Sequence, residues 1–304
     1  MKKVIMKQIS LCIYLMILIL PLVNGQQLPL LQQQIEHRNP AFVPANFQKY
    51  DYATQASIEY NHQWIGLEDA PRTISGDFTN WNDDFSLLFG GNIIHDETGP
   101  TRFTGVSGKI GYGIQLTRDL LLTAAIKGGF VQYRIQGDQL KFLDPGDFTE
   151  AGTSQLYPDI SLGSMLYIED KYYVGFSIPQ IFGLNLEFGE ENRASNIQRD
   201  RHYHGVAGVR FDLFMDSWLD LSSEVHYVPE TPVLVSFNLV HDYREIYWLN
   251  TSYSTANRMR LGGGIFHDIG INRVSIGYFF SHFFQSYGPN YGSTHELQMS
   301  FSWN

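Results

Sequence analysis

Alternation of apolar and polar side chains along the chain constrains its fold more than any other feature of the sequence. In residues 297–303, LQMSFSW, apolar side chains occupy every second position. A period of two predicts a β-strand with one apolar and one polar face. The pattern recurs in about fourteen segments, so the sequence predicts an all-β protein. The segments are residues 52–64, 72–80, 85–95, 102–116, 120–136, 157–168, 172–182, 202–214, 218–228, 232–241, 244–254, 258–267, 272–282 and 294–303.

The connections between these segments alternate in length. Every second connection is short and rich in Asp or Asn, as tight turns are. These short connections are residues 81–84, 117–119, 169–171, 215–217, 241–243 and 268–271. The others are longer on average, with residues 136–156 and 183–201 the longest, although those near 229–231 and 256–257 are short. Tight turns on one rim and long loops on the other are typical of an outer-membrane β-barrel.

Residues 1–25 have the three regions of a secretory signal peptide. Three lysines precede an apolar run at residues 9–23, and Gly25 is a small residue suited to cleavage. We expect cleavage near Gly25; the alternative is a retained N-terminal anchor, for which the run is short. The single cysteine, Cys12, lies within this run, so the exported chain is expected to have no disulfide and no thiol nucleophile.

Charge and hydropathy narrow the class of protein. Without the three lysines of residues 1–25, 18 basic and 31 acidic residues remain. Nucleic acid is therefore not an expected partner, because phosphate binding needs clustered Lys and Arg. No later segment approaches 18 continuous apolar residues, so a transmembrane helix is not expected. The sequence instead predicts an antiparallel transmembrane β-barrel of about 14 strands in the outer membrane of a Gram-negative bacterium; a secreted β-sandwich is the alternative.

Barrel closure gives a physical reason for the apolar strand at the C-terminus. In hydrocarbon every backbone N–H and C=O must be paired within the protein, and a closed sheet achieves this. The last strand should therefore pair with the first, with Leu297, Met299, Phe301 and Trp303 facing lipid. We assign residues 50–304 to the barrel. Residues 26–49 are rich in Gln and lack a strand pattern, so we expect an irregular N-terminal segment that either plugs the barrel or lies in the periplasm.

The five tryptophans have two interpretations. Aromatic residues at strand ends suit the membrane interface, but they serve equally well as packing residues. The tryptophans are Trp64, Trp81, Trp218, Trp248 and Trp303.

Few residues form a pattern that indicates chemistry. His202 and His204 share a strand face, and with carboxylates from the next strand they could bind zinc; a hydrogen-bonded polar lumen is the favoured interpretation. Residues 95–97, His-Asp-Glu, are expected in a solvated turn rather than a metal cluster. Glycine pairs and triplets at 128–129 and 262–264 indicate strand bends rather than a phosphate-binding loop. No spacing selects a Ser–His or Asp–His pair, so we expect no enzyme, no metal and no cofactor.

Six stretches of the sequence carry a family resemblance. They are NPAFVPAN (39–46), NHQWIGLEDAPRTISGDF (61–78), HDETGPTRFTGVSGKIGYGIQL (95–116), YPDISLGSMLYIEDKYYVGFSIPQIF (157–182), HYHGVAGVRF (202–211) and STHELQMSF (293–301). In this order they resemble the PorP/SprF family of type IX secretion system outer-membrane proteins. One departure is Asp69, which precedes Ala70-Pro71 where the family often has glycine.

The resemblance implies a non-enzymatic barrel that assists export through the type IX system or holds exported adhesins at the cell surface, sometimes in gliding motility. It implies a periplasmic component or lipoprotein of the secretion system on one rim and the C-terminal domain of a secreted protein on the other, with outer-membrane lipid around the barrel. We expect docking on residues 136–156 and 183–201 outside and on the N-terminal segment inside. The alternative is a passive outer-membrane channel for small solutes, since a polar lumen fits that function too.

The resemblance also marks residues that are either structural or partner-binding. For Gly66, Pro71 and Pro158, turn or bulge geometry is the simpler role. The marked residues are Asn39, Pro40, Gln63, Trp64, Gly66, Ala70, Pro71, Tyr157, Pro158, His295 and Glu296.

Overall fold

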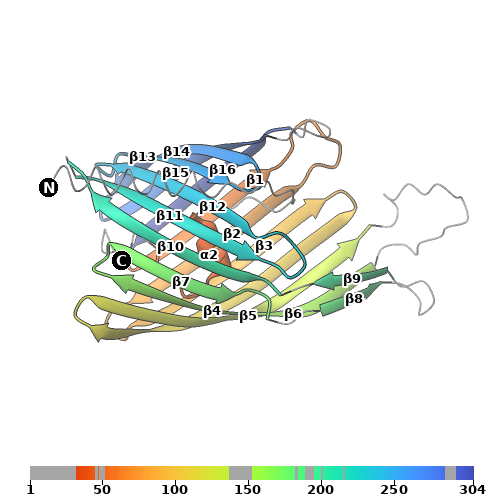
Figure 1. Ribbon diagram of the computed structural model, residues 1–304, viewed down its shortest axis with the longest axis horizontal. Coiled ribbons are helices and arrows are strands. Elements are labelled where there is room, and N and C mark those ends of the chain that lie inside the picture. Colours follow the sequence, from red (N-terminus) through yellow and green to blue (C-terminus); the bar gives the residue numbers. More distant parts are fainter. Residues whose placement is uncertain are drawn as a thin grey trace, which may run out of the picture.

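The computed structural model describes residues 32–44, 47, 52–136, 153–181, 184–188, 195–199, 201–214, 216–284 and 292–304. Fourteen strands form one closed antiparallel barrel (Figure 1), which confirms the predicted fold class. The barrel strands are β1 (Thr54–His62), β2 (Arg72–Asn82), β3 (Leu87–Thr98), β4 (Thr101–Thr117), β5 (Leu120–Ile135), β6 (Thr153–Ile168), β7 (Tyr172–Ile178), β10 (Tyr203–Asp212), β11 (Ser217–Tyr227), β12 (Leu234–Tyr243), β13 (Tyr247–Ser254), β14 (Arg258–Ile269), β15 (Asn272–Phe283) and β16 (Thr294–Trp303).

The seam between β1 and β16 closes the barrel. Thr54 lies opposite Trp303, and His62 lies opposite His295. Because β16 also pairs with β15, the final strand is bonded on both sides. A closed ring removes the open strand edges that would otherwise expose unpaired backbone groups.

Side chains on the barrel strands alternate between the outer face and the lumen. On β16, Leu297 and Met299 are 54% and 47% exposed, whereas Ser300 and Ser302 are buried. Ile93 on β3, Val106 on β4 and Phe130 on β5 likewise project large apolar side chains outward. An apolar outer face and a polar interior are the arrangement expected of a barrel surrounded by lipid.

The tryptophans divide between packing and outward positions. Trp81 and Trp218 are buried. The Trp248 ring packs against Phe279, with centroids 5.1 Å apart. Trp303 lies instead beside Phe301. Packing is therefore the role of Trp81, Trp218 and Trp248, and Trp303 is the one of these four suited to a membrane interface.

Short turns occupy the rim that holds the C-terminus, as predicted. Glu169 and Asp170 have φ values of 50° and 53°, and Arg244 and Glu245 have values of 52° and 56°. Two successive residues with positive φ are the hairpin geometry that matches the twist of antiparallel strands. The predicted turn at 241–243 is wrong by a few residues, because β12 continues to Tyr243 and the turn follows it.

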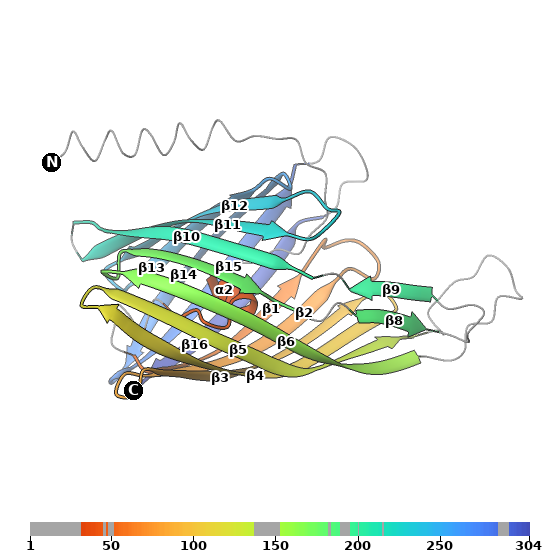
Figure 2. The same cartoon turned by 60° about the horizontal axis from the view of Figure 1, so that its bottom comes forward.

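On the opposite rim the structure corrects two expectations. Residues 95–97 lie within β3, not in a loop, and β3 joins β4 through Gly99 and Pro100 alone. Residues 183–201, expected to be a loop, contain β8 (Leu184–Phe188) and β9 (Ser195–Arg199), which form a separate two-stranded sheet beyond the barrel wall (Figure 2).

The helix α2 (Gln32–Arg38) and residues 39–44 lie inside the barrel (Figures 1 and 2). We call residues 32–44 the inner segment. The expectation of an irregular segment is wrong for residues 32–38; a helix of seven residues depends on tertiary contacts for its stability. No described helix is long and apolar enough to cross a membrane. A buried apolar cluster joins the segment to the wall: Ile35, Ala41, Phe42, Val43, Phe47, Trp81, Leu88, Met165, Tyr167, Tyr173 and Val206 are among its members.

Candidate functional site

Four successive residues of the inner segment, 36–39, make polar side-chain contacts with the barrel wall. Glu36 is the first. Its Oε1 lies 2.7 Å from the Lys109 Nζ on β4 and also accepts a hydrogen bond from the Thr79 hydroxyl on β2. Burial alone would raise the pKa of Glu36, but the Lys109 ammonium and these hydrogen bonds hold it below its ordinary value. Glu36 is therefore ionised at neutral pH, and the pair with Lys109 is a buried ion pair.

His37 contacts three strands of the same wall. Its Nε2 lies 3.2 Å from Asp77 Oδ2, its Nδ1 lies 3.2 Å from the Asn92 amide nitrogen, and Lys127 donates to its backbone carbonyl at 2.7 Å. Burial and then the Lys127 ammonium lower the pKa of His37 to about 4. The ring is therefore neutral at neutral pH, with Nε2–H donating to Asp77 and Nδ1 accepting from Asn92.

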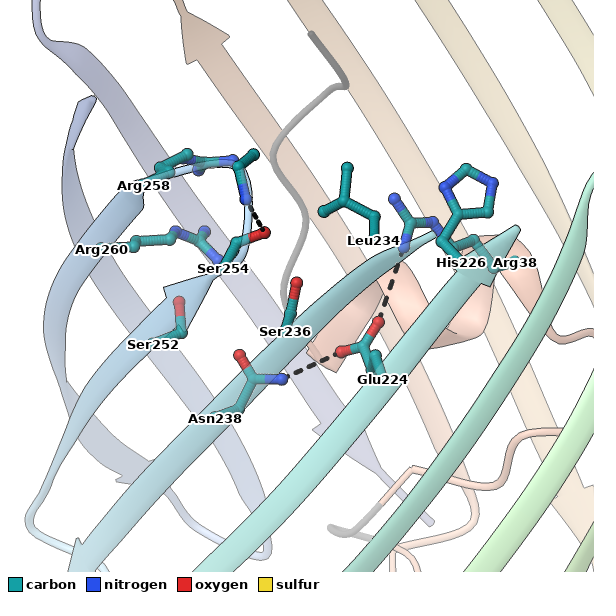
Figure 3. A pocket seen from close by; sticks show the side chains of 11 residues that line it. Arg38, Glu224, His226, Leu234, Ser236, Asn238, Ser252, Ser254, Arg258 and Arg260 are labelled. Atoms are coloured by element: carbon teal, nitrogen blue, oxygen red, sulfur yellow. Dashed lines mark hydrogen bonds and ion pairs between the residues drawn. The ribbon is translucent and has the colours of Figure 1, made fainter. Parts of the chain in front are cut away.

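Arg38 reaches the other side of the lumen. Its Nη1 lies 3.6 Å from Glu224 Oε2 on β11. Glu224 also contacts His204 Nε2 at 3.1 Å and accepts a hydrogen bond from the Asn238 amide at 3.1 Å. Figure 3 shows the contacts of Glu224 with Arg38 and with Asn238. The inner segment is thus bound by charged and polar groups on two walls.

Asn39 fits into a notch formed by two glycines of β6 and β7. Its amide nitrogen donates to the Ser164 carbonyl at 3.1 Å and to the Phe176 carbonyl at 3.4 Å. A Cβ on Gly163 would lie 2.0 Å from Asn39 Oδ1, and one on Gly175 would lie 3.0 Å from Asn39 Nδ2. A side chain at Gly163 would therefore displace Asn39, whereas one at Gly175 would collide first with Met165 Sδ, 2.0 Å from the added Cβ.

The next residues extend this contact. Pro40 packs over Gly163, Thr123 donates to the Ala41 carbonyl at 2.8 Å, and the Val43 N–H donates to the Tyr167 hydroxyl at 2.8 Å. Hydrogen bonds of this kind satisfy backbone groups of a segment that has no strand neighbour. The Asn-Pro-Ala stretch is the part of the segment fitted most closely to the wall.

Other marked residues gather on the rim opposite the C-terminus. In the β1–β2 connection, the Gln63 N–H donates to the Pro71 carbonyl at 2.9 Å, and the Ile65 N–H donates to the Ser293 carbonyl at 3.0 Å. His295 lies two residues after Ser293, and its ring contacts the Tyr278 hydroxyl at 2.5 Å. The β1–β2 connection, which carries Gln63 and Pro71, is thus bonded to the start of the β16 side of the seam, where His295 lies.

Backbone angles explain two positions in the β1–β2 connection. Gly66 has φ of 103°, a conformation that side chains rarely adopt. Asp69 has φ of 59°, in the left-handed region where glycine is common and Asp is tolerated. The family's frequent glycine at this place and the Asp of this chain are therefore compatible with one turn geometry.

Tyr157 and Pro158 lie apart from these groups. Both belong to β6, where the Tyr157 ring meets Tyr133 edge to face and Pro158 lies opposite Phe130. Glu296 lies in the lumen, ion-paired with Arg260 and 3.7 Å from Arg258 on β14. The marked residues therefore form a lumen group and a rim group, with Tyr157 and Pro158 outside both.

The metal hypotheses find little geometric support. His204 is bound by Glu224, and His202 by His226, with ring nitrogens 3.2 Å apart. Within the described ranges, no group of three His, Cys, Asp or Glu side chains could hold a metal ion. The His204–Glu224 contact is instead the hydrogen-bonded polar lumen favoured from the sequence.

The sequence profile of one family, described as type IX secretion system membrane protein PorP/SprF, matches residues 23–301. The chain belongs to the PorP/SprF family. No curated protein sequence matches it. Among solved structures, this PorP/SprF protein is similar to the CymD monoaromatic hydrocarbon channel (TM-score 0.53, 10% identity, 86% of this chain and 92% of that one). It is also similar to the Ralstonia pickettii toluene transporter TbuX (TM-score 0.53, 12% identity, 93% and 96%) and to a Pseudomonas aeruginosa FadL homologue (0.52, 10%, 92% and 96%).

At these identities, the likeness extends to the fold alone. In this PorP/SprF protein, several residues of the inner contacts had no motif to mark them: Glu36, Arg38, Lys109 and Glu224. Lys109 and Glu224 were present in the sequence as charged residues on predicted strands, whereas Glu36 and Arg38 lie in a segment for which no strand was predicted. No sequence signal indicated which strands residues 32–44 contact inside the barrel.

Proposed function

We propose that this PorP/SprF protein is an outer-membrane accessory of the type IX secretion system that assists export or surface attachment of secreted proteins by protein–protein binding. The observation that carries the proposal is the occupied lumen. Residues 36–39 bind β2, β4, β6, β7 and β11 through side chains or backbone groups. A barrel filled by its own chain leaves its rims as the surfaces for partners.

The two rims suit different partners. The rim with long connections carries residues 136–156 and 183–201, and β8 and β9 extend the latter beyond the barrel. We assign the C-terminal domain of a secreted protein, such as an adhesin, to this rim. The rim with short turns faces the periplasm in this assignment and receives a periplasmic component or lipoprotein.

Co-purification from native membranes tests the proposal. The full chain, tagged at its C-terminus, is isolated in mild detergent, and bound proteins are identified by mass spectrometry. We expect an exported surface protein and a secretion-system component. Replacing residues 137–152 with a short Gly-Ser linker should remove the surface protein and leave the barrel in the membrane. Retention of the surface protein by this variant would reject the docking site, and loss of every specific partner from the unmodified chain would reject the proposal.

A passive channel for small solutes is the second candidate, and the structural similarity to channels and transporters favours it. Planar-bilayer conductance separates the two functions. We expect the full chain to show no large steady pore, and a variant lacking residues 32–44 to conduct. A large steady conductance of the unmodified chain would favour the channel.

A further inference from the structure

A pocket in the lumen lies between the end of α2 and strands β11–β14 (Figure 3). Arg38 borders it on one side, and Arg258 and Arg260 of β14 border it on the other. Its volume of about 40 Å³ corresponds to roughly three water molecules, so one small anion could take their place. We propose that this pocket binds a small oxyanion, a phosphate or carboxylate group, between the three arginines. This inference goes beyond the accessory function and does not depend on it.

Donor groups without acceptors are the first observation. Arg260 is 2% exposed, and its Nη2 is bound to Glu296. Among the residues that the structure describes, its Nε and Nη1 meet no acceptor, and neither does the Nε of Arg258. A buried N–H without an acceptor is costly, and a guanidinium presents its donors in a fork that matches an oxyanion.

The guanidinium groups are held in place by aromatic rings. Arg260 lies over the Phe279 ring at 4.1 Å from its centroid, and Arg258 lies over Phe283 at 5.5 Å. Arg258 Nη2 also donates to the Ser281 hydroxyl at 2.9 Å. Stacking fixes the plane of each group, so the remaining donors point in a constant direction. In Figure 3 the Arg260 side chain extends toward Ser254.

The charge of the pocket lining is positive. Three arginines line it against one carboxylate, Glu224. Glu224 is ion-paired with Arg38 and accepts from His204 and Asn238, and Glu296, outside the lining, is ion-paired with Arg260 and lies 3.7 Å from Arg258. Glu59 of β1 also interacts with Arg260 electrostatically but does not line the pocket. These carboxylates therefore offset part of the charge of the arginines, but the lining itself holds three arginines against one carboxylate, so an added anion meets a net cationic lining.

Hydroxyl groups complete the lining. Ser236 of β12 and Ser252 and Ser254 of β13 lie between the two arginine sides. A hydroxyl can turn to donate to an anion whose other oxygens face guanidinium groups. Because Arg38 belongs to the inner segment, a bound anion would link that segment to β14. Among the described residues, 36–39 make no hydrogen bond of their own to β14.

Titration calorimetry of the purified full chain in detergent tests the proposal, with inorganic phosphate and acetate as separate probes at constant ionic strength in NaCl. We expect one saturable site for at least one probe, and the stronger of the two tells a phosphate ligand from a carboxylate ligand. Arg260→Gln should weaken binding about tenfold or more, since a hydrogen bond to a charged group contributes about 1.5–3 kcal/mol and each tenfold is about 1.4 kcal/mol.

Two further variants keep the test decisive. Ser252→Ala with Ser254→Ala removes donors without touching an ion pair, and should weaken binding even if Arg260→Gln does not fold. Arg210→Gln is the matched control, because Arg210 is a buried lumen arginine that is bound to Asp220 and lies outside the pocket. The affinity of this variant for the probe anion should stay within about twofold of the affinity of the unmodified chain. No saturable heat with either probe, or equal affinity in the double-serine variant and the unmodified chain, would overturn the proposal.

Discussion

Gly163→Ala should release the inner segment from the barrel wall. The added methyl would lie 2.0 Å from Asn39 Oδ1 and 2.8 Å from Pro40 Cδ, so Asn39 must leave the notch. Its amide then loses the bonds to the Ser164 and Phe176 carbonyls. With about 1 kcal/mol for each of the two hydrogen bonds and about 1–3 kcal/mol for overpacking, docking weakens by roughly 3–5 kcal/mol. The undocked population then rises by about a hundredfold to a few thousandfold.

A cysteine placed in the segment reports this population. The sequence has one cysteine, Cys12, so residues 26–304 carry none and accept a single reporter, Val43→Cys. Val43 is buried, so the thiol of a cysteine at this position reacts with a maleimide only when the inner segment leaves the wall. The labelling rate should rise with Gly163→Ala in proportion to the undocked population.

The matched control is Gly128→Ala. Gly128 is a glycine of the neighbouring strand β5 whose added Cβ meets nothing within 4 Å. Its labelling rate should equal that of the Val43→Cys background. Equal rates for Gly163→Ala and Gly128→Ala would refute the notch as the holding point.

Three further predictions concern charge and membrane position. Because the docked state lowers the pKa of His37 to about 4, the undocked state binds the proton more tightly; docking is strongest above about pH 6.5 and loses up to about 3 kcal/mol as the pH falls toward 4. The rate of thiol labelling, referenced to a free peptide thiol at each pH, should increase as the pH falls over this range, and His37→Gln should abolish the increase. The groups that face His37 are Asp77, Asn92 and Lys127, with Glu36 and Lys109 nearby. Glu36→Gln leaves the Lys109 ammonium buried and unpaired, so docking should weaken by about 3 kcal/mol, with partial recovery on adding Lys109→Met; a double-mutant cycle without coupling would contradict the ion pair. Met299→Lys on the outer face should destabilise the barrel in lipid vesicles by about 2–4 kcal/mol in urea unfolding, whereas Gln298→Lys toward the lumen should cost much less; equal losses would contradict the assignment of faces.

Strand positions could be predicted from the sequence because two local signals agree at most of them. Alternation sets the body of each strand, and Asp- or Asn-rich turns set its ends, so β16 begins and ends at the predicted residues. At residues 241–243 the signals conflict: Asp242 suggests a turn, yet the strand continues and Asp242 is buried. There, burial in the lumen outweighs the local preference of Asp for turns.

The inner segment and its contacts could not be predicted from the sequence. Helix α2 has seven residues, too few for a helical period to be recognised, and its stability comes from the wall. Gly163 and Gly175 appear in the sequence as ordinary strand glycines, and no local signal indicates that Asn39 docks against them. The Arg260–Glu296 pair likewise joins two strands separated by β15, which no spacing in the sequence reveals.

Helix α2 also has a mechanical consequence for the barrel. In the ring of fourteen strands, β2 and β11 are seven positions apart, so they lie diametrically opposite each other. His37 holds β2 through Asp77, and the adjacent Arg38 holds β11 through Glu224. A sheet closed only by its own hydrogen bonds can flatten into an ellipse under lateral pressure from the membrane. Two consecutive residues here connect opposite walls of the ring, and this link resists such flattening.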